Sequence, residues 1–147
     1  MNFELSQEQI AVQKTAREFA INELLPDAVE RDEKKIWPSE AVKKMGELGF
    51  MGMMVDPKWN GSGMDAISYT IAIEEISRID ASASVIMSVN NSLVCSVLEK
   101  YGSEHIKEKY LKVLSLGGKL GAFSLSEPQS GSDASNMITT ARKEGDF

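Results

Sequence analysis

The stretch AISYTIAIEEISRID, residues 66–80, runs directly into ASASVIMSVNNSLVCSVLEKYG, residues 81–102, and together they decide the fold. Both runs are apolar or small on nearly every side, with charge confined to one side of the first. Asp65 can cap the first run, Asp80 interrupts the pair, and Gly102 can end the second. Because two such helices need cover on most faces, the stretch predicts a central helical hairpin in an all-α domain.

The flanking segments carry helix signals of their own. Ser6 and Gln9 have the spacing of a capping box, and the apolar periodicity that follows predicts a helix from about residue 7 to 25. Pro26 breaks that pattern and predicts a kink before a polar helical continuation. Pro38 and Gly49 bracket a short helix, and residues 103–117 form an amphipathic one. We therefore expect a mainly α fold of about five to six helices in up-down packing.

The pattern changes after Gly118. KLGAFSLSEP, residues 119–128, and MITTARKEGDF, residues 137–147, have the period-two or short runs that are typical of strands, and the second contains β-branched and aromatic residues. An isolated strand or two has no stability of its own in water. We therefore predict an N-terminal all-α domain over residues 1–118 and the incomplete beginning of a β domain over residues 119–147.

Composition argues against several classes of function. The chain has 147 residues, is 42% hydrophobic and carries a formal net charge of -6, which disfavours duplex nucleic acid as a partner. The single cysteine, Cys95, lies on an apolar helical face and is predicted to be a buried thiol. The single histidine, His105, lies among charged residues and is predicted to be solvated, so no metal site is expected. Without a signal peptide or a long uninterrupted apolar run, we expect a cytoplasmic location and no membrane span.

Several polar residues stand out against this background. Asn90 and Asn91 lie inside an apolar helix, where their amides need several partners. They could line a polar pocket, or they could make hydrogen bonds between helices. Glu74 and Glu75 also lie on an apolar helix, and pairing with Arg78 is the simpler interpretation.

The stretch FSLSEPQSGSDAS, residues 123–135, is the best binding candidate. Small residues around Gly131 would let a ligand approach the backbone, and Ser126 and Ser132 offer hydroxyl groups without a repelling charge. A plain turn after a strand is the alternative that the residues leave open.

The order of these motifs resembles that of the acyl-CoA dehydrogenases. LSEPQSGSDAS, preceded by KLGAF and followed by TTARKEGD, is similar to the flavin-binding signature of that family. The stretches VDPKWNGSGMD, IAIEEISRIDAS and KYGSEHIKEKYL resemble its N-terminal helical domain, and SVIMSVNNSL is similar to the short-chain, or butyryl-CoA, branch. Ser124 and Asn136 depart mildly from the usual signature, where smaller residues are common.

The resemblance implies a flavoenzyme that holds FAD and oxidises a short-chain acyl-CoA to the trans-2-enoyl-CoA. The residues that would contact FAD by similarity are Phe123, Leu125, Ser126, Gly131 and Ser132. The residues that would contact the acyl-CoA are Ser132, Met87, Asn90, Asn91 and Val94. The catalytic glutamate of the family matches no position here, and Glu127 is expected to stabilise a turn instead.

The resemblance also implies electron-transfer flavoprotein as the electron acceptor and a homotetramer as the assembly of the whole enzyme. We expect this polypeptide alone to be inactive and to bind FAD weakly or not at all, because it would carry one wall of a shared site. The alternative is a small helical interaction protein that retains a remnant flavin motif.

Overall fold

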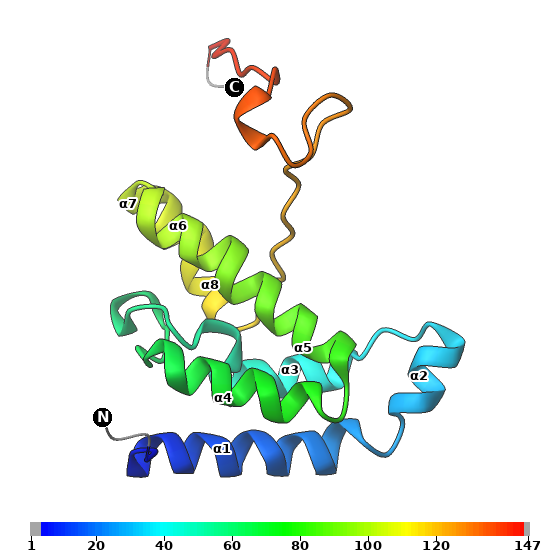
Figure 1. Ribbon diagram of the computed structural model, residues 1–147. Coiled ribbons are helices and arrows are strands. Elements are labelled where there is room, and N and C mark those ends of the chain that lie inside the picture. Colours follow the sequence, from blue (N-terminus) through cyan, green and yellow to red (C-terminus); the bar gives the residue numbers. More distant parts are fainter. Residues whose placement is uncertain (1–3, 146–147) are drawn as a thin grey trace.

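A computed structural model describes residues 4–145, and its helices form six continuous rods. Several rods contain a π-helical segment, and Figure 1 shows how they pack together. The rods are α1 (Gln7–Phe19) with π-helix Ala20–Leu24, α2 (Ala28–Lys34), α3 (Ser39–Glu47), α4 (Ala66–Ser77), α5 (Ala81–Ser88) with π-helix Val89–Cys95 and α6 (Ser96–Tyr101), and α7 (Glu104–Ile106) with π-helix Lys107–Leu111 and α8 (Lys112–Ser115). Short 3-10 turns occupy Phe50–Gly52, Pro57–Trp59 and Ala134–Asn136. The mainly α prediction is confirmed.

The predicted helix boundaries are confirmed by their caps. The backbone N–H of Gln9 donates to Ser6 Oγ at 3.2 Å, and the Gln9 side chain accepts from the Ser6 N–H at 3.0 Å. Asp65 accepts from the Ser68 N–H at 2.6 Å and so caps α4. Gly49 follows α3 with φ of 78°, a left-handed conformation that glycine adopts without strain.

Two groups of buried side chains form the core. The larger joins α1, α3, α4 and α5 through residues such as Phe19, Met45 and Met87. The smaller surrounds Trp59 and Cys95 and includes Leu111. Burial raises the pKa of the Cys95 thiol to about 11, which confirms the prediction of a buried, unreactive cysteine. His105 is exposed, as predicted.

Two ion pairs across the core differ from the sequence expectation. Glu75 is buried and accepts two hydrogen bonds from Arg17 of α1, at 2.5 and 2.9 Å, while Arg78 lies farther away at 3.5 Å. The main partner is therefore a residue 58 positions away and not the neighbouring arginine. Arg31, in the segment predicted to be a polar continuation, is buried and donates to Asp80 at 2.6 Å. This pair fastens α2 to the corner between α4 and α5.

The predicted strands after Gly118 are wrong for the described residues. Within 119–145 the only β interaction is an isolated bridge between Glu127 and Ser130. A strand needs a neighbour to accept and donate its backbone hydrogen bonds, and no described segment supplies one to this part of the chain. The segment instead extends away from the helices (Figure 1). The last two positions of the predicted strand, 146 and 147, lie outside the described residues.

One described helix, Ala81–Tyr101, is long and apolar enough to span a membrane by length and composition alone. It also carries Asn90 and Asn91, which are fully buried and bonded to other segments of the chain. A core helix passes the same test, and these bonds show that one face of this helix packs against other segments of the chain.

Candidate functional site

Asn90 lies at the junction of three segments. Its Nδ2 donates to the carbonyls of Met51, at 2.8 Å, and Leu114, at 3.1 Å. Its Oδ1 accepts from the backbone N–H of Gly121 at 3.0 Å. One buried amide thereby connects the central helix to the turn after α3, to α8 and to the beginning of the segment that carries the candidate signature.

Asn91 makes a second junction beside the first. Its Oδ1 accepts from the Met53 N–H at 2.8 Å, and its Nδ2 donates to the carbonyls of Phe50, at 2.8 Å, and Met87, at 2.9 Å. Of the two interpretations left open by the sequence, hydrogen bonding between elements is the one the structure shows for both amides. Both residues lie in the π-helical turn Val89–Cys95, and π turns recur at functional sites.

We define the strap as residues 119–126, which leave the helical body after α8. The strap is fixed at its root, because Gly121 donates to Asn90 and packs closely against Val94. A Cβ at Gly121 would lie 2.5 Å from Val94 Cγ1, so only glycine fits this approach. Beyond the root, Phe123, Leu125 and Ser126 are exposed.

The exposed strap offers unused hydrogen-bond donors. Within the described chain, no hydrogen bond is made by the backbone N–H groups of residues 122–126. Phe123 is 46% exposed and Leu125 is 41% exposed, so flat and aliphatic side chains lie beside these donors. A planar, partly polar ligand is the kind of molecule that such a surface can bind.

We define the clasp as residues 127–139, which follow the strap. Glu127 and Ser130 exchange backbone hydrogen bonds of 2.8 and 3.1 Å, which makes a tight turn. The buried Ser130 hydroxyl donates to the Asp133 carbonyl at 2.7 Å. Gly131 and Ser132 follow this turn and are exposed, and a Cβ at Gly131 would meet nothing within 4 Å. A ligand can therefore approach this part of the backbone closely.

The Glu127 carboxylate holds the clasp closed. It accepts from the backbone N–H groups of Ile138, at 2.8 Å, and Thr139, at 3.0 Å, and from the Gln129 side chain. Hydrogen bonds from the Thr139 hydroxyl and the Ile138 N–H lower the pKa of Glu127 to about 2, so the group stays ionised near neutral pH. The predicted turn-stabilising role of Glu127 is confirmed.

The structure places the predicted site residues in two groups. Met87, Asn90 and Asn91 are inaccessible in the helical body, and half-buried Val94 contacts the strap root. The predicted FAD contacts lie along the strap and, for Gly131 and Ser132, directly after the Glu127–Ser130 turn of the clasp. The link between the groups is the Asn90–Gly121 hydrogen bond, which the sequence interpretation did not predict. The sequence signal for this bond was a pair of adjacent asparagines in an apolar helix, but the sequence does not show which groups their amides bond to.

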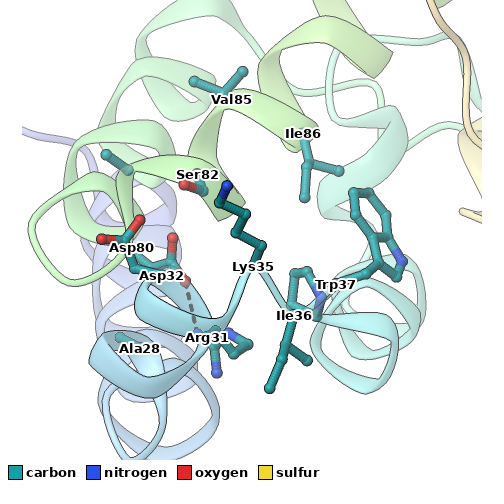
Figure 2. Close-up of a pocket in the computed structure, with 12 residues that line it drawn as sticks. Ala28, Arg31, Asp32, Lys35, Ile36, Trp37, Asp80, Ser82, Val85 and Ile86 are labelled. Carbon is teal, nitrogen blue, oxygen red and sulfur yellow. Dashed lines mark hydrogen bonds and ion pairs between the residues drawn. The ribbon is translucent and has the colours of Figure 1, made fainter.

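A cavity of about 550 Å³ lies elsewhere, between α2, the 35–38 turn and the beginning of α5. In Figure 2, Lys35 points across it toward Ser82, and Trp37 and Ile86 form the opposite side. None of the predicted cofactor or substrate residues lines it. Among residues 4–145, no group of His, Cys, Asp or Glu side chains could hold a metal ion.

Comparison with known proteins identifies the class to which this fold and strap belong. The family model for the acyl-CoA dehydrogenase N-terminal domain matches residues 6–117. The chain belongs to the acyl-CoA dehydrogenase family. The short-chain specific acyl-CoA dehydrogenase of Rattus norvegicus mitochondria is 47% identical over 143 residues, covering 97% of this chain and 35% of the relative.

Solved structures agree. Butyryl-CoA dehydrogenase from Megasphaera elsdenii is 38% identical, covers 95% of this chain and 37% of its own, and has a TM-score of 0.86. A chain in a structure described as the electron transferring flavoprotein of Acidaminococcus fermentans is 40% identical, with a TM-score of 0.94 over 99% of this chain and 38% of its own. A glutaryl-CoA dehydrogenase from Mycobacterium smegmatis in complex with FADH2 is 34% identical, with a TM-score of 0.89 over 96% of this chain and 36% of its own. This chain therefore spans little more than a third of the length of these proteins.

Proposed function

We propose that this chain is the N-terminal part of a flavin-dependent acyl-CoA dehydrogenase that converts short-chain acyl-CoA to trans-2-enoyl-CoA. The observation that carries the proposal is the exposed strap with its unpaired N–H groups, fixed to a helical body of this family. We place the domain boundary after residue 118, since the helices end at Ser115 and the family match ends at 117.

FAD is the proposed cofactor, supported by the relative solved with FADH2. When bound, it would accept a hydride from the substrate. Phe123 and Leu125 would cover the ring, while Ser126 and nearby N–H groups would donate to it. Donors aimed at atoms that gain negative charge stabilise the reduced form. Gly131 and Ser132 would contribute from the clasp, where the backbone is open to approach.

The proposed substrate contacts are Ser132 and the helix that holds Met87, Asn90, Asn91 and Val94. Because the first three of these helix residues are inaccessible in the described chain, they would act by fixing the shape of this wall. Val94 and Ser132 have accessible atoms that could meet an acyl chain or thioester. Bulk along the helix would favour short chains, which agrees with the butyryl-CoA and short-chain relatives.

For the whole enzyme we propose electron-transfer flavoprotein as acceptor, a homotetrameric assembly and a cytoplasmic location. The first is supported by the similarity to a chain in an electron transferring flavoprotein structure. No residue of this sequence matches the family's catalytic glutamate, so we propose that residues 1–147 alone do not oxidise acyl-CoA.

The proposal is tested by joining residues 1–147 to the remaining two thirds of a short-chain relative. We expect the joined protein to bind FAD stoichiometrically and to lose its flavin absorbance on addition of butyryl-CoA. The relative itself, purified in the same way, is the control. A folded joined protein that binds no flavin, while the control does, would contradict the proposal.

A further inference from the structure

The cavity between α2, the 35–38 turn and the beginning of α5 has the size and walls of a small-molecule site. Its volume, about 550 Å³, lies within the range of about 300–1,000 Å³ that is usual for ligand pockets. Trp37 and Ile86 line one side of it (Figure 2), and Trp37 is 53% exposed. Within the described part of the chain, the Trp37 ring stacks on no other ring and on no cation. An uncovered apolar wall is therefore open to a ligand.

Two charged side chains that line the cavity have no partner in residues 4–145. Asp32 and Lys35 lie three residues apart at the C-terminal end of α2, and the side chain of neither makes a hydrogen bond or an ion pair there. Arg31, which also lines the cavity, differs because it pairs with Asp80, at 2.6 Å, and with Asp27. The unpaired charges of the cavity lining are therefore one negative and one positive.

Lys35 has a backbone conformation that is unfavourable for lysine. Its φ is 54°, in the left-handed region, where glycine is usual at the end of a helix. The Ile36 N–H donates to the Arg31 carbonyl at 2.9 Å and closes this turn, and the Lys35 side chain extends across the cavity toward Ser82 (Figure 2). Residues held in such conformations concentrate at functional sites. The strain is thus a second observation, independent of the cavity, that points to a ligand of this lysine.

We propose that this cavity binds a small zwitterion with an apolar side chain, of the class of the aliphatic α-amino acids. The ligand's carboxylate pairs with Lys35 and accepts from the Ser82 hydroxyl, and its ammonium group pairs with Asp32. Its side chain covers Trp37 and Ile86. A ligand with only a carboxylate would be repelled by Asp32, and one with only an ammonium group would be repelled by Lys35. The proposal does not rest on the proposed function, because no strap or clasp residue lines the cavity.

The test titrates the 147-residue chain with L-leucine and follows tryptophan fluorescence. The chain has two tryptophans, and Trp59 is buried, so the change should come from Trp37. Three matched probes each lack one feature: 4-methylvalerate lacks the ammonium group, 3-methylbutylamine lacks the carboxylate, and glycine lacks the apolar side chain. We expect leucine to saturate the signal with a Kd of about 1 mM or lower. Each matched probe should bind at least about tenfold more weakly.

Substitutions on α2 separate the site from a general effect of charge. Asp32→Asn and Lys35→Gln should each weaken leucine binding at least about tenfold. Glu33→Gln and Lys34→Gln remove the same charges from neighbouring exposed residues that do not line the cavity, so they should leave binding unchanged. Lys35→Gly should bind leucine as weakly as Lys35→Gln but raise the urea midpoint of unfolding, because glycine adopts a φ of 54° without strain.

The absence of a saturable fluorescence change with leucine up to about 10 mM, tenfold above the expected Kd, would overturn the inference. Equal binding of leucine and 4-methylvalerate would also overturn it, as would unchanged leucine binding after Lys35→Gln or Asp32→Asn. None of these results bears on the proposed function, because the strap and the clasp take no part in them. Conversely, failure of the joined protein to bind FAD would contradict that function and leave the cavity proposal standing.

Discussion

Replacing Asn91 with leucine should destabilise the helical body strongly. The two side chains are similar in size, but leucine cannot bond to the Met53 N–H or to the Phe50 carbonyl, which the amide now contacts at 2.8 Å each. Met53 is 1% exposed and Phe50 is 4% exposed, so water cannot readily replace the lost partner. Each buried group left unsatisfied costs about 1–3 kcal/mol, so we expect a loss of about 2–6 kcal/mol.

The assay is urea unfolding followed by far-UV circular dichroism, with Ser96→Ala as the control. Ser96 lies on the same continuous helix but is exposed, and its replacement should change the free energy of unfolding by less than about 0.5 kcal/mol. For a chain of this size, a loss of 3 kcal/mol corresponds to roughly 6–12 °C in Tm. A loss below about 1 kcal/mol for Asn91→Leu, with an unchanged m value, would refute the reasoning that these bonds hold the turn after α3.

Three further predictions concern other contacts. Gly121→Ala should cost about 1–3 kcal/mol by urea unfolding, because the new Cβ would lie 2.5 Å from a Val94 methyl group; a neutral result would show that the strap root is loosely held. Glu75→Gln should lower the free energy of unfolding by about 1–3 kcal/mol, toward the lower end because Arg17 is half-exposed. The Arg17 hydrogen bonds lower the pKa of Glu75, so the stabilisation by the Glu75 carboxylate should be present above pH 4.5 and fade below it. An equal loss of stability at pH 3 and pH 7 would contradict this. The pKa of Glu127 is lowered to about 2, so NMR shifts of the Ile138 amide should stay constant from pH 7 to about pH 4 and change only as the pH approaches 2; a midpoint near 4.5 would argue against the carboxylate contacts.

The parts of the fold that sequence predicts well are local ones. The Ser6–Gln9 capping box, the Asp65 cap and the left-handed Gly49 each depend on residues within one turn of each other, so their spacing alone identifies them. The central hairpin is predicted for a related reason, since its apolar periodicity is a property of one continuous stretch.

The parts that sequence cannot predict depend on residues far apart. Nothing near Glu75 indicates that Arg17 will be its partner, and the nearer Arg78 is the better guess from spacing. Asn90 is recognisable as an unusual amide, but its partners at Met51, Leu114 and Gly121 follow only from the packing of three segments.

The predicted strands show the limit of propensity. β-branched residues favour an extended backbone but cannot form a ladder without a partner strand, and two of the N–H groups involved bond to Glu127 instead. Contact of the strap and clasp residues with FAD stays a prediction from resemblance. The exposure of these residues and the unbonded N–H groups of residues 122–126 support that prediction.

The central claim, that the strap faces the flavin, is tested most directly by cysteine alkylation in the joined protein. Cys95 is buried with a raised pKa and should not react, so Ser126→Cys can be followed alone when the added two thirds carry no cysteine. We predict that FAD slows alkylation of Ser126→Cys at least about tenfold but leaves Lys143→Cys, a control far from the strap in sequence, unchanged. Equal alkylation rates at Ser126→Cys with and without bound FAD would contradict the account.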